Sequence, residues 1–97
     1  MGSYLVFVIR PARFICDRAM DEIFELHGDH LEMLSRVSVV NESLFQTVAS
    51  SLFDREVTLI NIGIFLAYCV KLRKNHPWKK QYIDRKVFEV LTQRLKF

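Results

Sequence analysis

The sequence has few residues that end helices, with only three Gly and two Pro among its 97 residues. Glycine and proline mark most turns and loops, so a chain this poor in both is expected to be mainly helical. Alternation of apolar and polar residues, the pattern of a half-buried strand, is weak. The short apolar run at residues 4–9 fits either a strand or a buried helix, because periodicity cannot separate the two at that length. Pro11 then ends this element or begins the next one.

Cysteine is also scarce. Cys16 and Cys69 are 53 positions apart and both lie in apolar surroundings, which favours two buried, reduced thiols. The sequence shows no signal peptide, which would be a basic segment followed by an apolar segment and a cleavage site of small residues. Val6 stands where a myristoylation signal has Ser or Thr. The sequence therefore predicts a cytoplasmic protein without a membrane anchor.

A long hydrophobic run is missing as well. The longest uncharged stretch, Val57 to Val70, has fourteen residues, whereas a membrane-spanning helix needs about 20. The stretch is apolar on every side, so other helices must surround it. We expect a central buried helix at about 58–72, with Thr58 as its N-cap and with Ile62 and Phe65 in the core.

Apolar residues make up 51% of the chain, which excludes a disordered protein. The length and the absence of a linker predict a single domain, 1–97. Amphipathic helices are expected on both sides of the central one, since apolar residues recur on one helical face. The first pattern, one helix or two divided at Gly28, holds Met20, Ile23, Phe24, His27, Leu31 and Leu34. The second, capped by Asn41 or Ser43, holds Phe45, Val48, Ala49, Leu52 and Phe53. The last follows a turn at Pro77 and holds Ile83, Val87, Val90, Leu91 and Leu95.

The charge is +3 overall but unevenly distributed. Residues 17–32 carry six acids and one base, and residues 71–97 carry nine bases and two acids. The bases are spaced through an amphipathic pattern, which favours the solvated face of a terminal helix over a nucleic-acid site. Bases interleaved with Trp78 and Tyr82 are the best case for the alternative, a basic nucleic-acid-binding module.

The sequence gives little support for a metal site or for a catalytic site. His27 and His30 have the i, i+3 spacing of two metal ligands, but a third ligand at suitable spacing is missing, since Cys16 and His76 are remote. No environment that would activate a Cys–His nucleophile pair is evident. We expect no catalytic residue, no metal and no cofactor.

The segment around the central helix contains Leu52-Phe53, Val57, Thr58, Ile62 and Phe65. With this spacing it resembles the first homology region of the Bcl-2 family, in which all but Thr58 match by identity and Thr58 replaces the family's Asn as an equivalent N-cap. Upstream, MDEIFEL and DHLEMLSRV are similar to the family's second helix. The resemblance covers roughly residues 16–72. Because no second homology region is evident, we expect an anchorless protein similar to the compact Bcl-2-like apoptosis inhibitors of viruses.

The resemblance implies a fold, a function and a partner. The fold is an all-α, Bcl-2-like bundle of amphipathic helices around the central one. The function is inhibition of apoptosis, in the host cytosol if the protein is viral, by holding the BH-3 helix of a pro-apoptotic protein in an apolar groove. The implied partner-binding residues are Leu26, Met33, Val37, Val48, Leu52, Thr58, Asn61, Ile64 and Tyr68.

The sequence departs from the family at the groove's charged position. Leu59-Ile60-Asn61 replaces the family's Trp-Gly-Arg, so a neutral amide stands where an arginine pairs with the ligand's aspartate. Arg55 and Arg36 are the candidates to replace that charge. If a ligand aspartate lies opposite Asn61, replacing Asn61 by Arg is expected to tighten binding.

Two further expectations stay open. A small α-helical adaptor or assembly protein unrelated to cell death is the main alternative to an apoptosis inhibitor. The high apolar content of a short chain also predicts an exposed apolar patch, and a symmetric homodimer through or near the groove would cover it.

Overall fold

The computed structural model describes residue 10 and residues 31–95. The elements expected at 4–9 and in the first half of the first amphipathic pattern, together with Cys16, Leu26, His27 and His30, lie outside the described residues. Most of the described residues are helical and none of them is in a strand, so this part of the chain agrees with the all-α prediction. Within 31–95, no helix is long and apolar enough to cross a membrane.

Helix α2 spans Glu42–Phe53, and of the two caps that the sequence allowed, Asn41 is the one that is used. The side chain of Asn41 accepts a 3.1 Å hydrogen bond from the backbone N–H of Leu44, one of the donors that a helix start leaves without an intrahelical partner. The helix is amphipathic, as expected, and buries its apolar side chains on one face: Leu44, Phe45, Val48, Ala49 and Phe53.

Helix α3, Leu59–Asn75, is the central helix. Thr58 caps it by accepting a 3.0 Å hydrogen bond from the backbone N–H of Asn61. Nine consecutive or nearly consecutive residues are buried, including Ile62 and Phe65, so both core predictions are confirmed. The run from Ile62 to Cys69 is buried on every side, which needs neighbouring elements around it, as the apolar stretch in the sequence predicts.

A short turn joins α3 to the last helix. Pro77 occupies the first position of a 3₁₀ turn, Pro77–Lys79, which leads into α4 at Lys80–Leu95. Proline suits such a first position, because its fixed φ is preset and its missing N–H has no partner there. Helix α4 buries Ile83, Val90 and Leu91.

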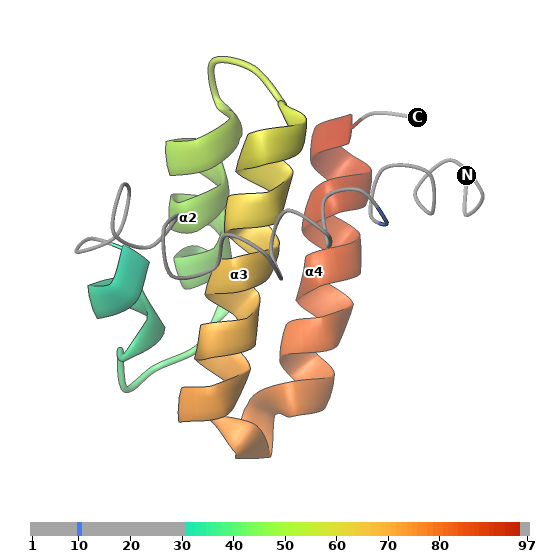
Figure 1. Cartoon of the computed structure of the whole chain (residues 1–97). Coiled ribbons are helices and arrows are strands. Elements are labelled where there is room, and N and C mark those ends of the chain that lie inside the picture. The colour runs from blue at the N-terminus through green and yellow to red at the C-terminus, as the bar shows by residue number, and fades with distance from the viewer. Residues whose placement is uncertain (1–9, 11–30, 96–97) are drawn as a thin grey trace.

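Helices α2, α3 and α4 pack together, with α3 running opposite to α2 and α4 (Figure 1). Two ion pairs connect α2 with α4. Lys86 donates to Glu42 near the start of α2, and Arg94 donates to Asp54, 2.9 Å away, just past the end of α2. The first pair joins the start of α2 to the first half of α4, and the second joins the end of α2 to the end of α4. Helices α2 and α4 therefore run in the same direction.

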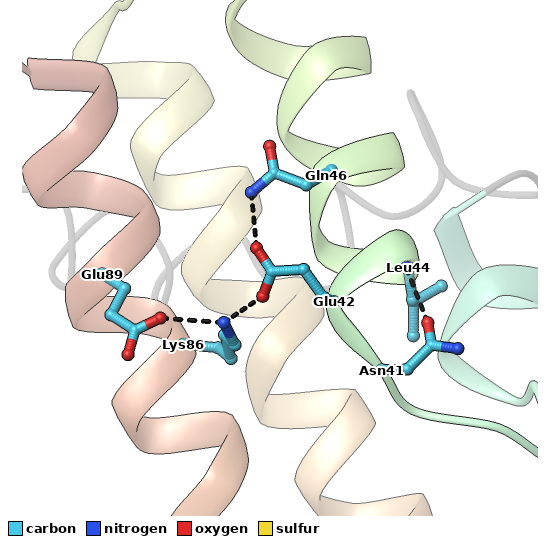
Figure 2. A network of polar contacts seen from close by, with 6 residues as sticks. All are labelled: Asn41, Glu42, Leu44, Gln46, Lys86 and Glu89. Atoms are coloured by element: carbon cyan, nitrogen blue, oxygen red, sulfur yellow. Dashed lines mark hydrogen bonds and ion pairs between the residues drawn. The ribbon is translucent and has the colours of Figure 1, made fainter.

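The first of these pairs belongs to a small network (Figure 2). The carboxylate of Glu42 accepts hydrogen bonds from Lys86 and, at 3.0 Å, from Gln46, while Lys86 also donates to Glu89 at 2.8 Å. These bonds favour the charged forms. They hold the pKa of Glu42 below its usual value and raise the pKa of Lys86.

Residues 31–40 pack along α3. Residues 31–35 are helical, and the phenol of Tyr68 donates a 3.2 Å hydrogen bond to the carbonyl of Leu34. Near the other end of α3, the side-chain amide of Asn75 donates to the carbonyl of Ser35 at 3.0 Å. Polar side chains of the central helix therefore fix this segment by its backbone.

Candidate functional site

The residues predicted to line the groove differ widely in exposure. Val48, Ile64 and Tyr68 are fully buried, whereas Met33 is 71% exposed. Four are half-buried: Val37, Leu52, Thr58 and Asn61. Leu26 lies outside the described residues. The structure brings three of the half-buried residues together at the connection between α2 and α3.

That connection is built by two side chains of the α3 start. Thr58 caps the helix, and the side-chain amide of Asn61 donates a 2.8 Å hydrogen bond to the carbonyl of Leu52. Leu52 lies in the last turn of α2, where carbonyls have no intrahelical partner. Asn61 therefore satisfies the end of one helix from the start of the next and fixes the angle between them.

A hollow of about 400 Å³ opens at this connection. One apolar side chain, several hydroxyl or amide groups and three charged side chains line it: Ser50, Ser51, Leu52, Asp54, Arg55, Glu56 and Asn61. We call it the junction hollow. Its lining combines an apolar contact with polar groups that could fix the orientation of a ligand.

The charged side chains of the junction hollow differ in whether they already form ion pairs within the protein. Asp54 accepts a 2.9 Å bond from Arg94, whose guanidinium also donates to Ser50 at 3.3 Å. Arg55 is exposed and forms no ion pair with any of residues 31–95. Arg55 is therefore the cation of the hollow that is available to a ligand.

The other arginine that the sequence offered as a replacement is already paired. Arg36 donates to the carboxylate of Glu32 at 2.8 Å, one helical turn away. It does not line the junction hollow, whereas Arg55 and Asn61 both do. The geometry thus favours Arg55 over Arg36 as the charge beside Asn61.

Apolar side chains are exposed next to the hollow in the sequence. Leu59 and Ile60, in the first turn of α3, are 41% and 58% exposed. Two exposed apolar side chains between Thr58 and Asn61 give this end of the bundle an apolar edge as well as a charge.

Sequence reasoning missed part of this site. Ser50, Asp54 and Arg94 belong to no recognisable sequence motif, and only the parallel packing of α2 and α4 brings Arg94 to the end of α2.

In the part of the chain that the structure describes, no three His, Cys, Asp or Glu side chains are placed to hold a metal ion. No protein-family model matches the sequence, and comparison with curated proteins and with solved structures finds no match.

Proposed function

We propose that this protein inhibits apoptosis by binding the BH-3 helix of a pro-apoptotic Bcl-2 family protein. The junction hollow carries the proposal. It holds Leu52 and Asn61, two residues singled out by the Bcl-2 resemblance, beside the available cation of Arg55. An apolar contact next to an arginine suits the apolar and acidic side chains of an amphipathic ligand helix.

The energy of such binding comes mainly from apolar burial. Each apolar anchor of the ligand contributes about 1.5–3 kcal/mol when buried, before the cost of ordering both partners. Four anchors are enough for submicromolar affinity. In this proposal the anchors contact Leu52, which lines the hollow, and Ile60, which is exposed next to Asn61 in the sequence. In this proposal the Arg55 guanidinium donates to the ligand's aspartate, a charge-assisted bond that also fixes the ligand's register.

No chemical step is needed. The protein acts by occupancy in the cytoplasm, because a pro-apoptotic helix held at the hollow cannot activate membrane-permeabilising partners. Asn61 has a supporting role, since its amide holds the α2–α3 connection in place. Ile60, where the family has glycine, adds an apolar contact and shifts the ligand outward from α3.

Calorimetric titration with a panel of BH-3 peptides tests the proposal. At least one peptide should bind with submicromolar affinity, and a sequence-scrambled version of that peptide should not bind. Binding should change little with salt, because groove binding is mainly apolar whereas phosphate binding falls steeply with salt. If none of the peptides binds, the proposal is contradicted.

We also propose that the free protein self-associates through or near the same surface. Leu59 and Ile60, in the first turn of α3 and next to the hollow in the sequence, are large apolar side chains that are 41% and 58% exposed. A symmetric dimer is the commonest way to cover such side chains. Sedimentation of the free protein should reveal a dimer that dissociates on addition of a bound peptide. A protein that remains monomeric at high micromolar concentration contradicts this proposal and leaves the peptide proposal intact.

A further inference from the structure

The end of the bundle where α3 leads into α4 carries an exposed tryptophan in a basic segment. Trp78 is 73% exposed, the highest value among the large apolar side chains of residues 31–95 that are more than a third exposed. Residues 71–80 contain five Lys or Arg and no Asp or Glu. This end lies opposite the α2–α3 connection, and therefore away from the junction hollow (Figure 1).

The turn that displays Trp78 is firmly anchored. The ring nitrogens of the buried His76 lie 3.0 Å from the carbonyl oxygen of Leu72 and 2.5 Å from that of Val37. The same ring meets the Trp78 ring edge-on, with 5.4 Å between centroids. Pro77 fixes the backbone between them. Trp78 is thus held on a rigid turn while most of its surface stays in water.

Lysines flank this tryptophan in the sequence, with Lys74 in α3, Lys79 on the turn and Lys80 at the start of α4. Lys74 and Lys80 are exposed, Lys79 is half-buried, and none of the three has a carboxylate partner among residues 31–95. The exposed part of the indole and the ammonium groups of Lys74 and Lys80 gain no burial from folding. The combination instead matches a partner that is both anionic and able to accept an aromatic ring.

The neighbouring hollow is not an anion pocket. It measures about 420 Å³ and is lined by Arg73, Lys80, Asp84 and Val87. Asp84 accepts a 2.6 Å bond from Arg73 and so offsets that charge. The attraction for an anionic partner therefore belongs to the exposed Lys74 and Lys80 on either side of the turn and not to a single enclosed site.

The second aromatic ring of the segment is unavailable for stacking. Lys79 lies over the Tyr82 ring at 4.9 Å and Lys86 at 5.8 Å, while Phe45 meets it edge-on at 6.1 Å. Single-stranded nucleic acid binds on a succession of aromatic platforms. With Tyr82 covered, Trp78 is a lone platform, which argues against nucleic acid.

We propose that this end of the bundle docks on the surface of membranes containing anionic phospholipids. Trp78 enters the headgroup layer, where indole rings are favoured because one side of the ring is apolar and the N–H can bind polar groups. Lys74, Lys79 and Lys80 are attracted by the negative surface potential. This docking needs no membrane-spanning segment, is reversible, and leaves the junction hollow on the opposite end accessible. It does not depend on the apoptotic function proposed above.

The chain's single tryptophan makes the test direct, because all indole fluorescence comes from Trp78. The full chain is mixed with vesicles of phosphatidylcholine containing phosphatidylserine and, separately, with pure phosphatidylcholine vesicles. We expect a blue shift of the emission and co-sedimentation with the anionic vesicles alone, both reduced by high salt. No shift and no co-sedimentation with the anionic vesicles would overturn the proposal.

Variants then locate the contact. Trp78→Ala should abolish co-sedimentation while circular dichroism stays unchanged. Each lysine near an anionic surface contributes enough for Lys80→Gln to weaken binding about 5-fold and Lys74→Gln/Lys80→Gln about 30-fold. Arg85→Gln removes the same charge from an exposed position further along α4 and should leave binding nearly unchanged. Equal weakening by Lys80→Gln and Arg85→Gln overturns the proposal. So does an emission shift with a single-stranded RNA oligonucleotide but not with vesicles.

Discussion

The side-chain amide of Asn61 donates a 2.8 Å hydrogen bond to the backbone carbonyl of Leu52, and so joins the first turn of α3 to the last turn of α2. In the Bcl-2 resemblance, Asn61 stands where the family has its groove arginine. The bond gives Asn61 a role in holding two helices together. Under the proposed function, the charge for a ligand's aspartate then comes from Arg55, which lines the same hollow.

Removing that bond should destabilise the fold. Asn61→Ala leaves a half-buried carbonyl at the end of α2 without its partner, which should lower the free energy of unfolding by about 0.5–1.5 kcal/mol. Urea unfolding measures this change. Gln81→Ala, at an exposed position of α4, is the control and should stay within about 0.5 kcal/mol of the parent. Equal stability of the two variants would mean that the Asn61 bond contributes nothing.

The same bond changes the expectation for arginine at this position. Asn61→Arg adds the charge that the family resemblance calls for, but it also removes the donor to Leu52. The variant should lose about as much stability as Asn61→Ala. Any gain in peptide affinity should therefore be measured at a temperature and pH where both proteins are fully folded.

Phe65 should be among the costliest residues to truncate. Its side chain is fully buried in α3, and its ring meets that of Phe53 edge-on with 5.7 Å between centroids. Phe65→Ala should lower the free energy of unfolding by about 3–5 kcal/mol through lost burial and the cavity left behind. Phe88, 55% exposed on α4, is the matched control. If Phe88→Ala cost as much in the same denaturant titration, α3 would not be the centre of the core.

Acid should weaken the link between α2 and α4. Lys86 first, and then Gln46, hold the pKa of Glu42 below its usual value. A carboxylate whose pKa is lower in the folded state stabilises the protein above its unfolded pKa of about 4.3, and that contribution is lost as pH falls through the folded value. Urea midpoints of the parent protein and of Glu42→Gln should therefore converge as the solution is acidified. A constant difference across that range would contradict the link.

Alkali should act through Tyr68. Burial, with a smaller effect of Cys69, raises the pKa of this phenol far above its usual range. The effect of pH on stability is therefore opposite to the effect that acts through Glu42. The neutral phenol stabilises the fold below the unfolded pKa of about 10, and this contribution is lost as pH rises above it. Tyr68→Phe should cost about 0.5–1.5 kcal/mol at neutral pH, because the bond to Leu34 is lost. Its stability should then fall less steeply than the parent's in alkali, as followed by thermal unfolding.

Local signals predicted helices α2, α3 and α4 well. The apolar run locates α3, and Asn41 and Thr58 cap helices because their side-chain oxygens reach backbone donors only two or three residues away. The relations between helices could not be predicted in this way. Neither the Asn61–Leu52 bond nor the Arg94–Asp54 pair follows from spacing, since both depend on how the helices pack.

The candidate site illustrates the same limit. Val48, Ile64 and Tyr68 were expected to line a groove, and the structure buries all three completely. Helical periodicity shows that a residue is on an apolar face, but it does not distinguish a face that meets another helix from one that meets a ligand. Arg55 was one of two candidates from the sequence, and only the junction hollow separates it from Arg36.

A double-mutant cycle between Arg55 and the ligand's aspartate tests the central claim most directly. Affinities of the parent protein and of Arg55→Gln are measured by calorimetry for a bound BH-3 peptide and for its aspartate-to-asparagine version, with Arg36→Gln as the matched control. We predict that replacing the aspartate weakens binding to the parent about tenfold, the size of a charge-assisted hydrogen bond, and has little effect on Arg55→Gln. Arg36→Gln should behave like the parent. Equal weakening for the parent and Arg55→Gln would contradict the account.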